Sequence, residues 1–478
     1  MLDLSPVIPE LVLAIGAMVL LMVGVYAGKS AKMLVWRGAY GVMILALIAI
    51  LGVDVPSSSF NGRFLVDAFA VFMKIAVLVG TLTALSMGRN YLTRRGLDHM
   101  EFPVLVLLAM LGMFMMVSAN DLLALYVGLE LQSLSVYVLA AFNRDRLRST
   151  EAGLKYFVLG ALSSGLLLYG VSLIYGFSGT TLFTGVALTA GQAVESGNIG
   201  LLVGMVFLVA GLAFKLSAVP FHMWTPDAYE GAPTPVTTLF AGAPKIAAMA
   251  LMVRVLMGPF GGMVAQWQQL VILLAIASMV LGAFAALRQT NIKRLMAYSS
   301  IAHMGYALCG LAAGTEQGVA AVAIYMAIYL TMTAGTFAII LSMRRKEGYS
   351  EDIADLAGLA QTHPSMALAM LILMFSLTGI PPLFGFFGKY YVFIATVEAG
   401  LWWLAVIGLV SSVVAAFYYI NIVRLMYFSE PAAAFERGED RAVGSVILSS
   451  TLINSPLCLL LLAPLGQAAQ AAAAGFGF

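Results

Sequence analysis

Four ionisable residues stand within long apolar stretches of the sequence, and their types suit proton transfer. In chain order they are one acid followed by three bases: Glu130, Lys215, Lys245 and Lys389. Burial disfavours the charged form of Glu and Lys, whereas pairing favours it, so a Glu and a Lys within reach exchange a proton when their separation changes. These residues therefore have the minimum chemistry of a proton relay. The structural alternative is a static Glu130–Lys215 ion pair that only fixes helix packing.

Two histidines and two further lysines lie near the same stretches. His222 and His303 lie within or beside apolar stretches and are candidates for a hydrogen-bonded chain, although an ordinary structural role explains each as well. Lys74 and Lys155 lie nearer the ends of their stretches, where a lysine extends its ammonium group to the membrane interface. For Lys74 this interfacial role is the favoured interpretation.

The composition requires a membrane around these residues. Hydrophobic residues make up 62% of the 478 and charged residues only 10%, and the mean hydropathy is +0.97. So little polar surface excludes a soluble protein. An ionisable group at membrane depth costs at least about 2.5 kcal/mol on insertion scales, so each of the four residues needs a reason to be there.

Apolar stretches of about 20 residues, the length that crosses a bilayer, recur along the whole chain. Fourteen candidate spans are residues 8–28, 33–53, 65–87, 101–118, 121–141, 152–176, 200–231, 236–257, 269–287, 295–313, 317–343, 365–397, 401–427 and 443–465.

The distribution of basic residues supports this count, because Lys and Arg concentrate in cytoplasmic loops. If fourteen spans alternate in direction, one face collects 18 of the 25 basic residues: Lys29, Lys32, Arg37, Arg89, Arg94, Arg95, Arg144, Arg146, Arg148, Arg288, Lys293, Arg294, Arg344, Arg345, Lys346, Arg424, Arg437 and Arg441. The opposite loops hold Arg63 and, near a helix end, Arg254. Both termini are therefore predicted on the non-cytoplasmic side.

Two spans, 200–231 and 365–397, are longer than one straight crossing needs, and each has proline near its middle. The first contains Pro220 and the second contains Pro381 and Pro382. Proline removes a backbone donor and clashes with the preceding turn, and a broken helix at membrane depth is tolerated where the freed groups are buried or face a wet cavity. We therefore expect both helices to be broken.

The sequences around the two breaks match each other in residue class. Residues 214–220 correspond to residues 375–381 at an offset of 161. The match predicts two repeats of five spans, residues 100–257 and 267–428, whose odd number of spans forces opposite orientations, a transporter architecture. Three helices in residues 1–95 and one in residues 429–478 flank them. The predicted fold is an all-α polytopic membrane protein of about 14 transmembrane helices, with two inverted five-helix repeats that each contain a broken helix.

Several other classes of function are disfavoured. The net charge of +2 is too small to indicate nucleic-acid binding. Cys309 and Cys458 form neither a CxxC motif nor a disulfide framework. With four histidines and no ligand-like spacing, the sequence offers no haem, iron–sulfur or zinc site, and it lacks a Gly-rich nucleotide loop. We therefore expect no cofactor or metal in this chain.

Residues 100–428 resemble a known family, the antiporter-like subunits of respiratory complex I, which are related to subunits of multisubunit sodium/proton antiporters. The most specific motif begins with residues 214–220 and continues as Phe221-His222-Met223-Trp224-Thr225-Pro226-Asp227-Ala228-Tyr229-Glu230-Gly231-Ala232-Pro233-Thr234-Pro235-Val236. Among the paralogous groups the sequence is most similar to subunit N, whose motifs are similar to Leu154-Lys155-Tyr156-Phe157-Val158-Leu159-Gly160-Ala161, Ala243-Pro244-Lys245 and Gly385-Phe386-Phe387-Gly388-Lys389-Tyr390. Subunit M usually has Glu at the position of Lys389, and the sequence also lacks the long lateral helix of subunit L.

The resemblance implies a role for each buried ionisable residue. The implied relay has a charged pair in the first half-channel, a central lysine and a lysine on the exit side: Glu130 with Lys215, then Lys245, then Lys389, with Lys155, Lys293 and His303 as weaker candidates. Quinone reduction elsewhere in the complex would alter the coupling of the charged pair and drive protons outward from the cytoplasm. FMN, iron–sulfur clusters and quinone are expected in other subunits.

The resemblance further implies a place in a bacterial inner membrane, among other membrane-arm subunits that include a paralogous antiporter-like subunit. Three competing functions remain at this point. The same lysines would serve a subunit of a sodium/proton antiporter or of a membrane-bound hydrogenase. The chain would alternatively be an assembly scaffold whose charges only hold helices together, or an independent solute carrier that transports when purified alone.

Overall fold

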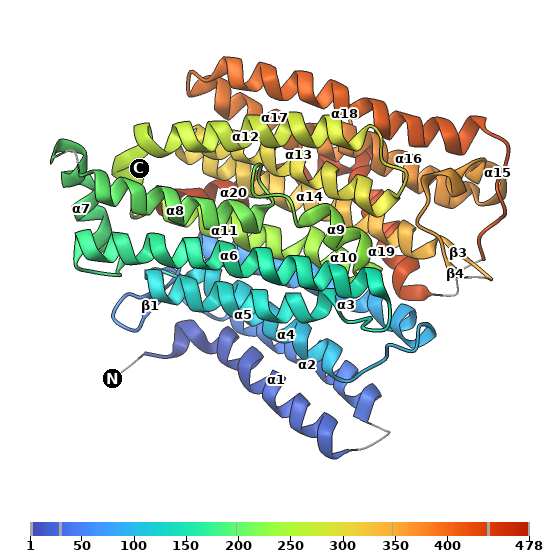
Figure 1. Cartoon of the computed structure of the whole chain (residues 1–478), viewed down its shortest axis with the longest axis horizontal. Helices are drawn as coiled ribbons and strands as arrows, with labels where there is room; N and C mark the ends of the chain where they lie inside the picture. Colours follow the sequence, from blue (N-terminus) through green and yellow to red (C-terminus); the bar gives the residue numbers. More distant parts are fainter. Residues whose placement is uncertain (1–2, 28–30, 197, 347, 437–439, 477–478) are drawn as a thin grey trace.

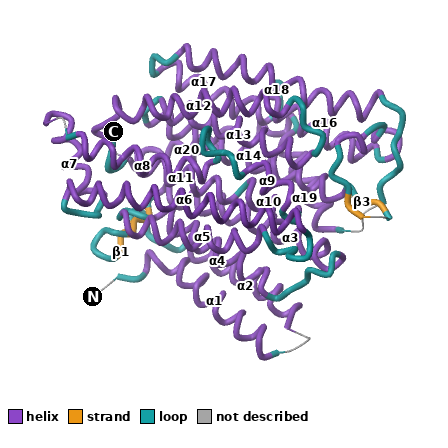
Figure 2. Tube along the Cα trace, in the orientation of Figure 1, coloured by secondary structure: helices purple, strands orange, loops and turns teal. Residues whose placement is uncertain are grey.

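The computed structural model is a bundle of helices that run roughly along one axis of the molecule (Figure 1). It describes residues 3–27, 31–196, 198–346, 348–436 and 440–476. Two short β-hairpins mark the two ends of the bundle, and loop segments also interrupt helices between these ends (Figure 2). Twelve helical segments of the described chain are long and apolar enough to cross a membrane, and the apolar helix Pro364–Thr378 is shorter.

The helices up to the first break are α1 Ile8–Tyr26, α2 Ala31–Leu51, α3 Ala68–Arg94, α4 Glu101–Ser118, α5 Leu122–Ala140, α6 Leu147–Ser178, α7 Phe183–Ser196 and α8 Ile199–Leu216. Those that follow are α9 Thr225–Gly231, α10 Thr234–Ala241, α11 Ala243–Met257, α12 Val264–Ala286, α13 Ile292–Ala312, α14 Glu316–Ser342, α15 Leu359–Thr362, α16 Pro364–Thr378, α17 Phe384–Glu398, α18 Trp402–Phe428, α19 Arg441–Asn454 and α20 Leu459–Ala473. The antiparallel hairpins pair β1 Ser57–Ser59 with β2 Phe64–Val66, and β3 Arg344–Arg345 with β4 Gly348–Tyr349.

The two ends of the bundle carry different elements. One end, which we call the termini end, carries β1 and α7, and the marks for both termini lie there (Figure 1). The other end, which we call the basic end, carries β3, β4 and α15 (Figure 1). Arg146, Arg148 and Arg345 line one cavity at the basic end, and Arg95 stacks on Tyr349 beside it. Lys29 and Arg437, which the charge pattern placed on the same face, lie outside the described residues.

Both predicted helix breaks are confirmed. Helix α8 ends at Leu216 and α9 begins at Thr225, while α16 ends at Thr378 and α17 begins at Phe384. The residue after each first half is left-handed, with φ of 62° at Ser217 and 90° at Gly379.

Serine side chains accept hydrogen bonds from backbone N–H groups at both breaks. Ser278 Oγ accepts from the N–H of Val219 at 2.9 Å, and Ser376 Oγ accepts from the N–H of Gly385 at 2.9 Å. Each break therefore satisfies freed donors within the protein, as a membrane interior requires.

The two broken helices run in opposite directions. In Figure 1, α8 starts near α7 at the termini end and α9 continues toward the basic end. Helix α16 starts near α15 at the basic end, and α17 continues toward the termini end. This opposition is the geometry that an inverted repeat would produce.

Two interruptions were not predicted. The span 236–257 is divided at Gly242, whose φ of −107° and ψ of −96° leave the helical region. Pro244 has no N–H and would clash with the preceding turn of a continuous helix. It is tolerated in the first turn of a new helix, which is its position in α11. The last span, 443–465, is likewise divided before Pro456, and α20 extends beyond it to Ala473. The prediction of fourteen crossings stays a prediction.

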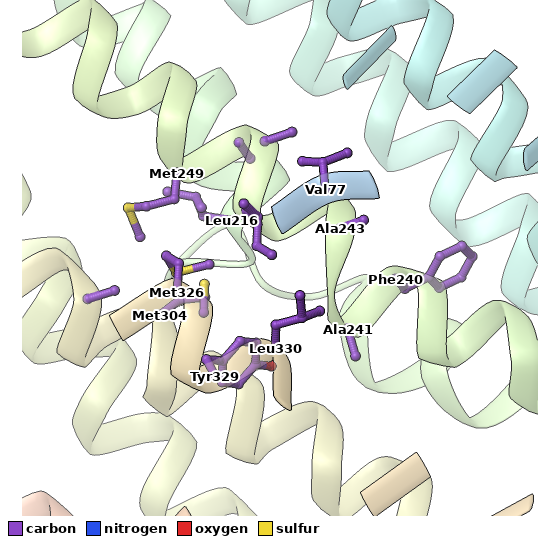
Figure 3. Packing of buried hydrophobic residues seen from close by; sticks show 14 of the residues in the cluster. Val77, Leu216, Phe240, Ala241, Ala243, Met249, Met304, Met326, Tyr329 and Leu330 are labelled. Atoms are coloured by element: carbon purple, nitrogen blue, oxygen red, sulfur yellow. The ribbon is translucent and has the colours of Figure 1, made fainter. Parts of the chain in front are cut away.

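Small residues allow close packing at the Gly242 interruption. A Cβ atom added at Gly80 of α3 would lie 2.9 Å from Leu330 Cδ1, and one added at Gly242 would lie 3.0 Å from the same atom. Leu330 of α14 thus lies against both glycines, near Ala241 and Ala243 (Figure 3). Because glycine has no side chain, Gly80 and Gly242 allow α3 and α14 to approach the start of α11 closely.

A buried ionic cluster joins the N-terminal helices to α11 and corrects the prediction for Lys74. Lys74 does not reach the interface: its side chain is 1% exposed and its Nζ lies 2.6 Å from Glu10 Oε1. Arg254 lies near a helix end as predicted, in the last turn of α11, and it is buried there and donates to Asp67 Oδ1 at 2.8 Å and Oδ2 at 3.0 Å. Lipid around these helix ends offers no solvation, so each charge takes an internal partner.

Replacing Asp67 by Asn should destabilise the protein strongly. Asn retains the oxygen that caps α3 by accepting from the Ala70 N–H, but it leaves the Arg254 guanidinium without a counter-charge. Removing one partner of a buried pair costs about 3–5 kcal/mol. The measurement is the thermal denaturation midpoint of the detergent-solubilised protein. As a control, Glu151→Gln opens the pair with Lys155, in which the side chains are 53% and 44% exposed, and an exposed pair contributes about 1 kcal/mol or less. Equal shifts for the two variants would contradict the prediction.

Candidate functional site

Lys215 ends the first half of the first broken helix. It lies in the last turn of α8 and is 6% exposed. Its Nζ donates to Ser133 Oγ at 2.7 Å and to Tyr137 Oη at 3.1 Å, both on α5. The C-terminal carbonyls of a helix carry partial negative charge, so this position favours an ammonium group.

Glu130 lies on α5 one turn before Ser133, so it is a neighbour of Lys215 without touching it. Its carboxylate accepts a hydrogen bond from Ser164 Oγ of α6. Among the ion pairs within 4.0 Å between described residues, none joins Glu130 to Lys215. The predicted charged pair is therefore indirect in this structure, and Ser133 lies between its members along the α5 face.

Lys245 is enclosed by protein and has no acidic partner among the residues that the structure describes. It lies in the first turn of α11 and is 0% exposed. Its Nζ donates to Ser300 Oγ at 2.7 Å, and Ser300 Oγ lies 3.5 Å from Tyr229 Oη. The first turn of a helix carries partial positive charge, which disfavours an ammonium group. Lys245 is therefore held in surroundings opposite to those of Lys215.

His303 continues the polar side chains along α13. It is 2% exposed, and its Nδ1 lies 2.7 Å from Tyr325 Oη while its Nε2 lies 3.3 Å from Tyr419 Oη. Tyr419 Oη is in turn 2.5 Å from Ser299 Oγ. Because Ser300 precedes His303 by three residues, α13 carries the contact of Lys245 and His303 itself on adjacent turns.

Lys389 occupies the second break. It follows the break on α17 and is 7% exposed. Its Nζ donates to the carbonyl oxygens of Leu377 at 3.1 Å and Thr378 at 2.7 Å, and to Ser412 Oγ at 2.6 Å. The two carbonyls end α16, so Lys389, like Lys215, is held by the negative end of a half-helix.

The weaker candidates lie in three different surroundings. Lys293 is buried in the first turn of α13 and pairs with Glu351 at 3.0 Å. Lys155 is 44% exposed at the basic end and pairs with Glu151 at 2.7 Å and Asp227 at 2.8 Å. His222 is partly buried in the segment between α8 and α9.

His222 Nδ1 has no hydrogen-bond partner among the described residues. His222 has a backbone hydrogen bond at Pro220, whereas both ring nitrogens of His303 contact buried tyrosine hydroxyl groups.

Several residues of the site were missed from the sequence. Ser133 and Tyr137 lie three and seven positions after Glu130, and Ser300 lies three before His303, so helical spacing alone places each on the face of a candidate. Ser164, Tyr229 and Tyr419 come from other helices, and no local spacing identifies them. These three residues are identified only from the way the helices pack in the folded structure.

Comparisons with known proteins identify the family of this chain. The transmembrane family described as NADH:quinone oxidoreductase/Mrp antiporter matches residues 119–415. NADH-quinone oxidoreductase subunit N of Parvibaculum lavamentivorans is 57% identical over 91% of this chain and 89% of its own length. Subunit N 1 of Rhizobium meliloti is 55% identical over 98% and 97%.

Solved structures show the same fold. A chain of respiratory complex I from Thermus thermophilus with bound aureothin has a TM-score of 0.80 at 33% identity, over 95% of this chain and 97% of that one. A chain of the Mrp complex from a Dietzia species has a TM-score of 0.85 at 22% identity, over 99% and 98%, which supports the fold alone. This chain therefore belongs to the NADH:quinone oxidoreductase/Mrp antiporter transmembrane family and, within it, to the subunit N family of NADH-quinone oxidoreductases.

Proposed function

We propose that this chain is a proton-translocating membrane-arm subunit of an NADH:quinone oxidoreductase, and that its buried lysines carry the protons. The chain acts in the enzyme without a redox site of its own, and FMN, iron–sulfur clusters and quinone belong to other subunits. The observation that carries the proposal is the environment of Lys245. This fully buried base has hydroxyl and aromatic neighbours and no acidic partner among the described residues. A permanent charge there would be uncompensated, so a base that gains and loses a proton suits the position.

The helix termini give the relay alternating preferences for a proton. The ammonium groups of Lys215 and Lys389 lie at the C-terminal ends of the half-helices α8 and α16, which stabilise a bound proton. Lys245 lies at the N-terminal end of α11, which favours release of its proton. A proton on Lys245 is thus the high-energy state between two lower ones. A change in the Glu130–Lys215 coupling shifts that balance, because Glu130 approaching Lys215 holds the proton there and Glu130 withdrawing releases it.

Bridging waters would complete the path. Direct hydrogen bonds among the described residues form separate segments around Lys215, Lys245, His303 and Lys389. Hydroxyl groups of serine and tyrosine end these segments, and such groups both donate to and accept from water. We place the order of transfer from the Glu130–Lys215 pair through Lys245 and His303 to Lys389.

The basic end supports an orientation. Basic loops mark the cytoplasmic face of membrane proteins, so we place the basic end in the cytoplasm and both termini outside it, in a bacterial inner membrane. The opposite directions of the two broken helices support division into inverted repeats at 100–257 and 267–428, flanked by 1–95 and 429–478. Other membrane-arm subunits, including a paralogous antiporter-like subunit, and lipid would cover the apolar surface.

Vesicles that hold the assembled enzyme test this function against its nearest alternatives. On addition of NADH and quinone, inside-out vesicles should acidify their lumen at the same rate with or without sodium. The signal should collapse with a protonophore and be absent from vesicles of cells that lack this chain. Acidification that requires sodium would favour a sodium/proton antiporter subunit. Transport by the purified chain alone would favour an independent carrier, and normal pumping after Glu130→Gln would favour a scaffold.

A further inference from the structure

A polar cavity opens at the basic end beside the start of α13. It has a volume of about 330 Å³. Arg146 and Arg148 line it from the start of α6, Arg345 from β3, and Glu351 and Asp352 from the segment that follows β4. Water and ions reach this cavity from the loop face, because it is open and polar.

Glu351 connects this cavity to the buried interior. Its side chain is 12% exposed, while that of Lys293 is 0% exposed, and the two are joined at 3.0 Å. The second carboxylate oxygen accepts from Asn291 Nδ2 at 3.3 Å. A backbone hydrogen bond of 2.8 Å from the Ile292 N–H to the Glu351 carbonyl fixes this segment against the start of α13. The carboxylate therefore has one side toward the cavity and one toward a lysine that solvent does not reach.

The electrostatics keep Glu351 ready to accept a proton. Burial raises the pKa of its carboxyl, but the charge of Lys293 and hydrogen bonds from Lys293 and Asn291 outweigh burial and hold the pKa below its usual range. The carboxylate is thus ionised at neutral pH, and it becomes a stronger base whenever Lys293 loses its proton, because the favourable charge is then gone.

Lys293 lies on the face of α13 that leads to Lys245. Ser300, which accepts from Lys245 Nζ, follows Lys293 by seven residues, which is two turns on one face and a rise of about 10 Å. Lys293 Nζ also donates to the carbonyl oxygen of Ala232 at 2.8 Å, at the junction that follows Tyr229 and its helix. Polar groups of α13 and α9 thus lie at both ends of the interval between Lys293 and Lys245.

The other ion pairs at the basic end are poorly suited to carry a proton inward. Asp227 and Glu230 both pair with Arg294, and Asp355 pairs with Arg345. Arginine does not release its proton in proteins. Lys155 pairs with Glu151 and Asp227, but its side chain is 44% exposed. Of the bases in these pairs, Lys293 is both buried and able to give up a proton.

We propose that Glu351 and Lys293 form a proton-uptake gate that supplies the relay at Lys245 from the basic end, as an entry separate from the Glu130–Lys215 pair. This inference rests on the proposed function and extends it. Lys293 passes its proton inward through bridging water to Ser300 and Lys245 and becomes a neutral amine. A hydronium ion in the cavity protonates Glu351 and leaves a water molecule, and the acid proton of Glu351 then moves to the amine. The ammonium–carboxylate pair is restored, one proton has moved inward, and no redox change occurs.

The test compares Glu351→Gln with wild type in the assembled enzyme, as NADH-driven pumping in vesicles at two external pH values. Without the carboxylate, Lys293 takes protons directly from water. The concentration of hydronium ions falls with each pH unit, so this transfer becomes slower. The variant should pump within about twofold of wild type near pH 6 and about tenfold more slowly near pH 8. Glu351→Asp should restore most of the rate at the higher pH. A Glu351→Gln deficit that is equal at both pH values, or no deficit, would overturn the gate.

Two further variants separate this inference from the proposed function. Glu436→Gln removes an acid that pairs with Arg344 at the same end of the bundle at 2.6 Å, and it should pump like wild type at both pH values. A Glu436→Gln deficit equal to that of Glu351→Gln would overturn the gate by assigning the effect to general loop charge. Lys245→Met is measured in the same vesicles. Normal pumping by Lys245→Met would refute the proposed function itself, whereas its failure beside a normal Glu351→Gln would refute only the gate.

Discussion

Replacing Lys245 by Met should lower NADH-driven proton pumping about tenfold or more while the enzyme still assembles. Removing a positioned proton-transfer group typically costs about 10²–10⁴-fold, and water that enters the vacated space makes the loss here smaller. Met has nearly the same length and no charge, so α11 keeps its packing while Ser300 loses the donor that lies at 2.7 Å. The rate of quinone reduction should fall in parallel, because a blocked relay slows the coupled redox step.

The control for this variant is Met249→Leu. Met249 lies one turn after Lys245 on the same helix and is equally buried at 0% exposure. A volume-conserving change there tests whether α11 tolerates substitution. Pumping and quinone reduction should both remain near wild type. If Lys245→Met also leaves both unchanged in an assembled enzyme, Lys245 is not part of the relay.

Glu130→Gln and Lys215→Met should each lower pumping severalfold, and the double variant should pump no worse than Lys215→Met alone. The two groups act as one unit in the proposal, because Glu130 works only by changing how firmly Lys215 holds its proton. Residues that work through each other give non-additive effects in a double-mutant cycle. The measurement is the initial pumping rate of all four enzymes at equal assembled content.

A second cycle on Arg344 and Glu436 controls for general effects of charge. These side chains pair at 2.6 Å and are 31% and 34% exposed, so their removal should leave pumping near wild type. If the Glu130 and Lys215 deficits simply multiply in the double variant, the two residues act independently. In that case Glu130 does not control Lys215.

The sequence predicted the broken helices because proline acts locally. Pro220 and the Pro381–Pro382 pair interrupt long apolar stretches, and the structure breaks both there. The division at Gly242 was missed although Pro244 lies inside the predicted span 236–257, because that span is no longer than one crossing needs and so gave no second sign of a break. That division depends on how closely Leu330, far along the chain, approaches Gly242. Contacts between distant residues of this kind leave no local pattern in a sequence.

In the candidate site, too, local sequence signals predicted some features, whereas contacts between distant residues could not be predicted. Burial of Lys215, Lys245 and Lys389 follows from their places in apolar stretches, and the structure buries all three. Their partners depend on how helices pack. Lys74 was assigned wrongly because its partner, Glu10, belongs to another helix.

The most direct test of the account is the number of protons pumped per NADH oxidised by the Lys215→Met enzyme, measured in vesicles together with its assembled content. Lys215 is buried, hydrogen-bonded to Ser133 and Tyr137, and placed where a half-helix ends. We expect the number of protons pumped per NADH oxidised, or the rate of NADH oxidation, to fall clearly below the wild-type value while assembly is intact. Wild-type values for both in a fully assembled enzyme would contradict it, because the buried lysine would then serve only to hold helices together.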